Sequence, residues 1–278
     1  MSAPSRLDAR ADLPAARRVA RCSTAAPAPG CEAPRAARSR SAALRGPVAP
    51  RAPCYSAAIV HATTKLMLIR HGETDDNRAQ VFQGQAGRGL NARGREQAAR
   101  LAERLAGARL RLSAVYCSDL ERAAETAERL ASALGLEPVA DAALREVSLG
   151  AWQGLSRADV QARFPEEWAA WRRGVDVRRG GGETYAELGD RMMRALDRIA
   201  GRHAGEAVGV VSHGAAIKTA VGRILQMDAG GLKVLQVPAN TGVCLLEHDP
   251  SSGYRVVVWN DAAHLGDALA EALSAPPA

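Results

Sequence analysis

From about residue 65 onward, short apolar runs alternate with longer segments of helical periodicity. Apolar runs of about four to eight residues bounded by polar sequence are typical of buried strands, and apolar residues spaced three and four apart are typical of helices. The pattern predicts strands at 66–69, 114–117, 207–212, 243–247 and 255–259, and helices at 91–106, 120–134, 184–202 and 215–225. This alternation predicts an α/β domain with three layers, α/β/α, around a mostly parallel central sheet.

The first 62 residues have a different composition. They are rich in Ala, Arg, Pro and Ser and show no sustained periodicity, so they lack the apolar surface that offsets the entropy of ordering a chain. We expect a disordered extension over 1–62, a catalytic domain over 63–270 and a disordered tail over 271–278. An Arg-rich transit peptide, and a start site further along near Met67, are the alternatives for the first segment.

The net charge of +7 is confined to the N-terminal segment. Residues 1–60 hold ten of the 37 basic residues but three of the 30 acidic ones, so the remaining chain balances 27 basic against 27 acidic residues. A neutral body has no electrostatic footprint for a phosphate backbone. No apolar run approaches the roughly 20 residues that span a bilayer. We therefore expect no nucleic-acid and no membrane partner.

The cysteines indicate neither a disulfide framework nor a metal site. Three of the five lie in the N-terminal segment, and the other two, Cys117 and Cys244, are not at a metal-ligand spacing. We expect a cytoplasmic protein.

Candidate chemistry lies where two of the predicted strands end. One strand ends at Arg70-His71-Gly72 and another at His213-Gly214, while Arg122 begins the helix that follows a third strand. A single His at a strand end is ordinarily a packing residue. Because the carboxyl ends of parallel strands meet at one edge of a sheet, however, two His and two Arg are expected to converge here.

The motifs around these residues resemble the histidine phosphatase superfamily, also called the phosphoglycerate mutase-like family, over about residues 65–265. Six elements occur in the order typical of that family, and together they are far more specific than any one of them. They are Arg70-His71-Gly72-Glu73-Thr74 with Asn77, Gln83-Gly84, Ser118-Asp119-Leu120-Glu121-Arg122-Ala123, Leu144-Arg145-Glu146 before Gly150-Ala151-Trp152-Gln153-Gly154, Gly181-Gly182-Glu183-Thr184, and Ser212-His213-Gly214.

The resemblance implies a catalytic role for five residues. His71 would attack phosphorus and form a phosphohistidine, because neutral imidazole is a good nucleophile near neutral pH. Arg70 and Arg122 would stabilise the transferring phosphoryl group with planar guanidinium donors. His213 would complete the phosphate pocket, and Glu146 would protonate the leaving group.

The resemblance also implies a wider substrate-binding set and no metal or cofactor. This set comprises Arg70, Asn77, Gln83, Gly84, Arg122, Glu183, His213 and Gly214. For Glu146, the alternative is a surface carboxylate that forms an ion pair with Arg145. Segment 164–179, with two Trp and four Arg, is expected to cap the site.

The family contains both phosphatases and mutases, and mutases carry a longer insertion after the acid. Glu146 and His213 are only 67 positions apart, which resembles the small phosphatase branch. We therefore expect a metal-independent phosphomonoesterase with a small phosphorylated substrate. The alternatives are a phosphoglycerate mutase, a protein-phosphohistidine phosphatase and a phosphate-binding pseudoenzyme, and a homodimer stays open.

Overall fold

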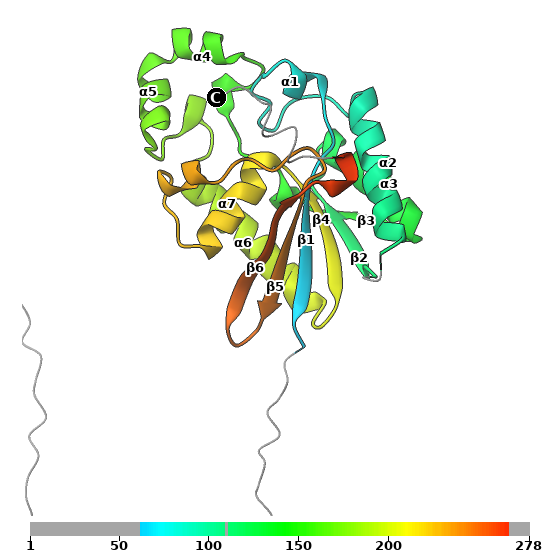
Figure 1. The fold of residues 1–278 in the computed structure, drawn as a ribbon. Coiled ribbons are helices and arrows are strands. Elements are labelled where there is room, and N and C mark those ends of the chain that lie inside the picture. The colour runs from blue at the N-terminus through cyan, green and yellow to red at the C-terminus, as the bar shows by residue number, and fades with distance from the viewer. Residues whose placement is uncertain (1–61, 109–110, 267–278) are drawn as a thin grey trace, which may run out of the picture. The chain divides into compact units, whose positions relative to one another are not determined.

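The computed structural model describes residues 62–108 and 111–266 (Figure 1). The tail expected at 271–278, and all but the last residue of the extension expected at 1–62, lie outside the described residues. The strands are β1 Thr64–Arg70, β2 Ala114–Cys117, β3 Pro138–Ala140, β4 Ala207–Ser212, β5 Val243–Asp249 and β6 Gly253–Asp261. The α-helices are α1 Asp75–Arg78, α2 Ala92–Ala106, α3 Glu121–Leu134, α4 Arg157–Arg163, α5 Pro165–Arg173, α6 Tyr185–Arg202 and α7 Gly214–Ile224. The 3-10 helices are η1 Ala142–Leu144, η2 Gly150–Trp152, η3 Arg179–Gly181, η4 Gly231–Val234 and η5 Ala263–Leu265.

The described strands form one six-stranded sheet in the order β3-β2-β4-β1-β5-β6. β3, β2, β4 and β1 pair in parallel, while β5 runs antiparallel to β1 and β6 antiparallel to β5. The prediction of an α/β fold with a mostly parallel sheet is confirmed. The edge strand β3 was not predicted, because a strand of three residues is too short to show a periodic pattern.

Helices cover both faces of this sheet (Figure 1). Leu66 and Leu68 of β1 belong to a buried cluster shared with α6 and α7, whereas Met67 and Ile69 belong to one shared with α2 and α3. Because successive strand residues point to opposite faces, a run that is apolar at every position is buried on both sides. The continuous apolar run of β1 thus places it in the middle layer.

The predicted helix starts agree with the structure to within one residue. Asn91 accepts a hydrogen bond from the backbone N–H of Gly94, and Thr184 accepts one from that of Glu187. Both are N-caps that satisfy donors left free in the first helical turn. The sequence pattern at these two positions therefore determined where α2 and α6 begin.

The segment that was expected to cap the site contains the short helix α5 and follows α4 near the carboxyl ends of the parallel strands (Figure 1). Its two tryptophans pack on each other and on the fully buried Trp152, with ring centroids 5.2 to 6.2 Å apart. Phe82 packs against the same three indoles. Aromatic packing therefore anchors the cap segment to the core.

Two glycines allow the loop after β1 to lie directly on the first turn of α2. A Cβ atom at Gly94 would lie 2.1 Å from the carbonyl oxygen of Glu73, and one at Gly72 would lie 2.5 Å from the carbonyl oxygen of Gly94. Side chains at either position are incompatible with this backbone contact. The contact holds the residues that follow His71.

We predict that Gly94→Ala lowers the free energy of unfolding by about 1–3 kcal/mol, because the added methyl group overpacks the contact with the Glu73 backbone. Gly201→Ala is the matched control. A Cβ there meets no described atom within 4 Å, and alanine is favoured over glycine in a helix by about 1 kcal/mol. Thermal unfolding of both variants checks this, and a Gly94→Ala protein as stable as wild type would contradict it.

Candidate active site

His71 lies immediately after β1 and is 3% exposed. Its backbone N–H donates to the carbonyl oxygen of Ser212, 3.0 Å away, at the end of the neighbouring strand β4. Its ring Nδ1 lies 2.7 Å from the carbonyl oxygen of Gly72. Since a carbonyl oxygen only accepts, Nδ1 carries the ring proton and Nε2 holds the free lone pair. The backbone thus determines which ring nitrogen is nucleophilic.

Arg122 lies against that nucleophilic nitrogen. Its side chain is 2% exposed, and its Nε donates to His71 Nε2 over 3.3 Å. The two other guanidinium nitrogens donate to the carbonyl oxygens of Ala86 and Gly84 at 2.8 and 2.7 Å. Gly84, expected to bind substrate, thereby contributes its carbonyl group to holding Arg122. A guanidinium fixed in this way is aimed at any group bonded to His71 Nε2.

His213 and Arg70 complete the group from β4 and β1. The His213 ring is fully buried, with its centroid 5.1 Å from that of His71. Arg70 Nη1 donates to the carbonyl oxygen of Pro238 over 2.7 Å. A Cβ at Gly214 would lie 2.6 Å from Val237 Cγ1 and 3.4 Å from Arg70 Nε, so the glycine allows both side chains to pack against the start of α7.

Several buried nitrogens of this group find no hydrogen-bond partner among the described residues. They are both ring nitrogens of His213 and Nε of Arg70. Buried polar atoms in native proteins are nearly always hydrogen-bonded. These unpartnered nitrogens indicate a site for a polar ligand, and the surrounding guanidinium groups favour an anion.

Burial and the neighbouring guanidinium groups set the charges of these residues. Burial, followed by the charges of Arg122 and Arg70, holds the pKa of His71 well below its usual value. Burial, with Arg122 again the largest charge, does the same to the pKa of His213. Burial lowers the pKa of Arg70 to about 10. Both imidazoles are therefore neutral and Arg70 remains cationic near neutral pH.

The carboxylate of Glu146 lies against the first turn of α7, the helix that begins directly after His213. Its Oε1 accepts from the backbone N–H groups of Val147 and Ala216, both at 2.9 Å, and its Oε2 accepts from that of Ala215 at 3.0 Å. Arg145 pairs instead with Asp119. The alternative of a surface Arg145–Glu146 ion pair is therefore wrong.

Asn77 lies in the short helix α1, and Gln83 lies in the loop that follows it. Asn77 Oδ1 accepts from the backbone N–H of Thr74 and from Asn240 Nδ2, each at 3.2 Å, which leaves the Asn77 NH₂ group as the donor for a ligand. Gln83 Nε2 donates to Thr74 Oγ1 at 2.9 Å, and its Oε1 is buried without a partner among the described residues. Asn240 Nδ2 also donates to the His71 carbonyl oxygen at 3.0 Å.

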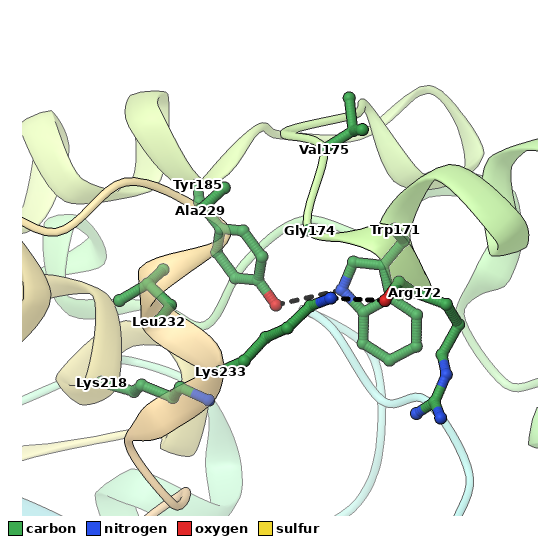
Figure 2. Close-up of a pocket in the computed structure, with 9 residues that line it drawn as sticks. All are labelled: Trp171, Arg172, Gly174, Val175, Tyr185, Lys218, Ala229, Leu232 and Lys233. Atoms are coloured by element: carbon green, nitrogen blue, oxygen red, sulfur yellow. Dashed lines mark hydrogen bonds between the residues drawn. The ribbon is translucent and has the colours of Figure 1, made fainter.

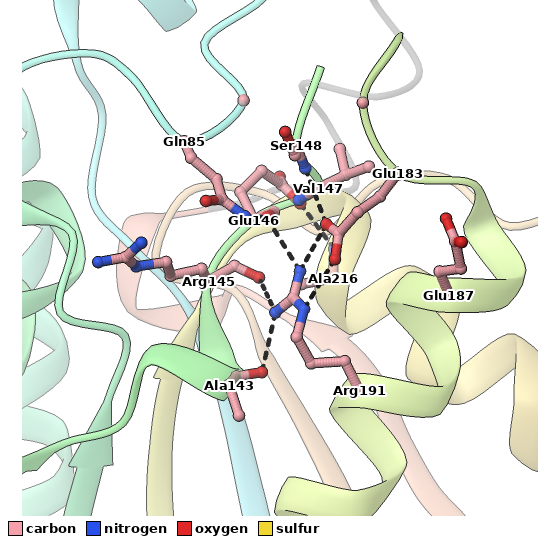
Figure 3. A network of polar contacts seen from close by, with 12 residues as sticks. Gln85, Ala143, Arg145, Glu146, Val147, Ser148, Glu183, Glu187, Arg191 and Ala216 are labelled. Atoms are coloured by element: carbon pink, nitrogen blue, oxygen red, sulfur yellow. Dashed lines mark hydrogen bonds and ion pairs between the residues drawn. The ribbon is translucent and has the colours of Figure 1, made fainter. Parts of the chain in front are cut away.

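Glu183, which was expected to bind substrate, is engaged by other groups of the protein. Its carboxylate accepts from the backbone N–H of Ser148 at 2.8 Å and from Arg191 at 2.8 and 3.0 Å. Arg191 also donates to the carbonyl oxygens of Ala143, Arg145 and Glu146 (Figure 3). Glu183 thus supports the loop that carries Glu146.

No feature of the sequence marks Arg191, because an Arg in the middle of a helix is ordinarily a solvated residue. Its role follows from the fold alone.

Within the described part of the chain, no three or more His, Cys, Asp or Glu side chains are grouped so as to hold a metal ion. The same residues include no helix that is both long and apolar enough to cross a membrane.

A buried neutral histidine, flanked by a second histidine and two guanidinium groups on an α/β sheet, defines the class of enzymes that handle phosphoryl groups on histidine. Residues 66–262 match the family model of the histidine phosphatase superfamily, branch 1. The chain belongs to this superfamily and is a phosphatase of the histidine phosphatase family, as the motifs predicted.

Two curated relatives from Arabidopsis thaliana are similar over most of their length. A phosphoglycerate mutase-like protein is 38% identical over 205 residues, which are 72% of this chain and 86% of the relative. A metal-independent phosphoserine phosphatase is 37% identical over 206 residues, which are 73% of this chain and 83% of the relative.

Solved structures give the same relationship. A mycobacterial glucosyl-3-phosphoglycerate phosphatase superposes with a TM-score of 0.65 at 30% identity, covering 70% of this chain and 98% of its own. A phosphoserine phosphatase from Entamoeba histolytica, solved with phosphoserine, superposes with a TM-score of 0.66 at 26% identity, covering 73% and 99%.

We predict that the His71 ring stays neutral as the pH falls from 8 through 6.5, because its lowered pKa postpones protonation to more acidic solution. The ¹⁵N chemical shifts of its imidazole, assigned with His71→Ala, should be constant over this range, with the pattern of a ring protonated at Nδ1. A titration midpoint of the His71 imidazole at or above pH 6.5 would contradict the lowering of its pKa by burial and by the neighbouring guanidinium charges.

Proposed function

We propose that this protein is a metal-independent phosphomonoesterase that acts through a phosphohistidine on a small phosphorylated metabolite. The observation that carries this proposal is the bond from His71 Nδ1–H to the Gly72 carbonyl oxygen. It directs a neutral, unprotonated Nε2 toward Arg122, the arrangement that a nitrogen nucleophile needs.

In the first step, the lone pair of His71 Nε2 attacks phosphorus while the bond from phosphorus to the ester oxygen breaks. Charge on the transferring phosphoryl oxygens is stabilised by Arg122 and Arg70, which are already desolvated and need little reorganisation. The single N–H of the neutral His213 ring and the NH₂ group of Asn77 are further donors for these oxygens. The product of this step is a phosphohistidine and a free alkoxide.

Glu146 supplies the proton that the alkoxide requires. Its Oε1 accepts two backbone N–H groups and its Oε2 only one, so Oε2 is the oxygen with room for a proton. In the second step the carboxylate takes a proton from a water molecule, which attacks phosphorus and breaks the P–N bond. Inorganic phosphate leaves, and His71 and Glu146 return to their starting states.

Several observations favour hydrolysis of a small substrate over mutase activity. The short separation of Glu146 from His213 leaves no room for the long insertion that mutases place over their substrate. The similarity to the Arabidopsis relative named a metal-independent phosphoserine phosphatase also favours phosphate hydrolysis without a metal ion. A phosphoglycerate mutase and a protein-directed phosphatase are the alternatives, and both would be favoured if the next experiment shows no release of phosphate.

We predict that wild-type protein releases inorganic phosphate from p-nitrophenyl phosphate in excess EDTA and that His71→Ala does not. Rapid alkaline quenching of wild type should trap phosphate on the protein, and later acid treatment should release it, as expected for a phosphohistidine. His248→Ala is the matched control. His248 lies on β5 and packs against Tyr254, away from the carboxyl ends of the parallel strands where His71 lies. Folded wild-type protein that releases no phosphate would refute the proposed function.

We predict that Glu146→Gln slows hydrolysis of alkyl phosphates by about 10²- to 10⁴-fold, the usual contribution of a general acid. The effect on p-nitrophenyl phosphate should be much smaller, because its phenolate leaves without a proton. The amide oxygen can still accept from the backbone N–H groups of Val147 and Ala216, and only the bond from Ala215 is lost, so folding is expected to survive. Steady-state rates with both substrates check this, and equal slowing would count against the role of acid.

A further inference from the structure

The loop that follows β1 is held by side chains from α2 and α3, and not by the cap segment. A cavity of about 360 Å³ lies between α5 and α7 and is lined by Trp171, Tyr185 and Lys218, among others (Figure 2). None of the described residues that line it forms a hydrogen bond with residues 71–74. The contacts that orient His71 come instead from the helices on the opposite face of the sheet.

The peptide between His71 and Gly72 is held at both ends. Its N–H donates to Oγ1 of Thr126 over 3.1 Å, and its carbonyl oxygen accepts from Nδ2 of Asn240 over 3.0 Å. The Thr126 side chain is fully buried on α3. This peptide cannot turn without losing both bonds, so the orientation of the loop around the ring depends on the next peptide, between Gly72 and Glu73.

The peptide between Gly72 and Glu73 carries the carbonyl group that fixes the tautomer of His71. A trans peptide is planar, and its N–H and C=O point in opposite directions. The carbonyl oxygen lies 2.7 Å from His71 Nδ1, and the N–H, which belongs to Glu73, donates to Oε1 of Gln97 over 2.9 Å. If this peptide were turned over, it would present an N–H to Nδ1. The ring proton would then lie on Nε2, and the lone pair would be on the wrong nitrogen.

Gln97 is the acceptor that holds this peptide in place. It lies one turn after Gly94 on α2, so the two residues share the face that packs against the loop. Its side chain is 8% exposed, and the Glu73 N–H has no other acceptor among the described residues. Because an N–H group needs an acceptor, the amide oxygen of Gln97 faces it. The bond to the N–H also polarises the peptide and makes its carbonyl oxygen a better acceptor.

We propose that Gln97 is a positioning residue for the nucleophile. It acts through the peptide between Gly72 and Glu73 and keeps the lone pair of His71 on Nε2, the nitrogen that attacks phosphorus. Its own amide has no role at the phosphate. The inference rests on the proposed function, because a nucleophilic His71 is what requires this tautomer.

The test is the ¹⁵N spectrum of the His71 imidazole in Gln97→Met and in Gln97→Leu, which both remove the amide acceptor. In wild type, Nδ1 should have the chemical shift of a protonated nitrogen and Nε2 that of an unprotonated one. In both variants the two shifts should move toward each other as two tautomers exchange. The value of kcat/KM for p-nitrophenyl phosphate should fall about three- to tenfold, the worth of one neutral hydrogen bond. Inhibition by inorganic phosphate should not weaken, because the guanidinium donors are unchanged.

Gln97→Glu retains an acceptor oxygen for the Glu73 N–H and should keep the wild-type shifts and rate. Glu96→Leu is the matched control, because it changes the preceding, exposed residue of α2, and it should leave both unchanged.

Wild-type ¹⁵N shifts in a folded Gln97→Met or Gln97→Leu protein would overturn the proposal, even if the rate fell. A loss of phosphate inhibition as large as the loss of rate would also overturn it, since that would indicate a general disturbance of the site. Wild-type protein that hydrolyses no ester would instead refute the proposed function. The spectra need no turnover, so they report on the tautomer independently of that result.

Discussion

The site depends on the parallel pairing of β1 with β4. In that register Arg70 lies opposite Ser212, and the His71 backbone N–H continues the ladder to the Ser212 carbonyl oxygen. The residue that follows each strand is a histidine, so the two imidazoles lie at the same level along the strand direction. A shift by one residue would send one ring to the opposite face of the sheet. Strand register, rather than any contact between the rings, sets their separation.

The catalytic charges are organised by backbone groups instead of acidic side chains. Carbonyl oxygens of Gly84, Ala86 and Pro238 hold the two guanidinium groups. Such dipoles orient Arg70 and Arg122 without neutralising them, so the positive potential stays available to an anion. Burial first, and this positive potential after it, keep both histidines unprotonated. The guanidinium charges therefore contribute both to the affinity for phosphate and to the nucleophilicity of His71.

A second framework holds the carboxylate on the other side of the site. The first N–H groups of α7 bind Glu146, as expected for a negative charge at a helix N-terminus, and Arg191 with Glu183 supports the loop that carries it. α7 thus links His213, which directly precedes it, with the acid that its first N–H groups hold.

The sequence by itself determined five of the six described strands, the starts of α2 and α6, the family, and the four residues His71, His213, Arg70 and Arg122, because periodicity and short motifs are local properties of the chain. It did not reveal the short strand β3, the tautomer of His71, the hydrogen bonds of Glu183 or the central position of Arg191 among them. Each of these depends on which backbone groups and side chains from distant segments meet. The sequence on either side of a residue carries no pattern that identifies such partners. Tertiary structure alone decided them, since hydrogen bonds and desolvation act between atoms brought together by folding.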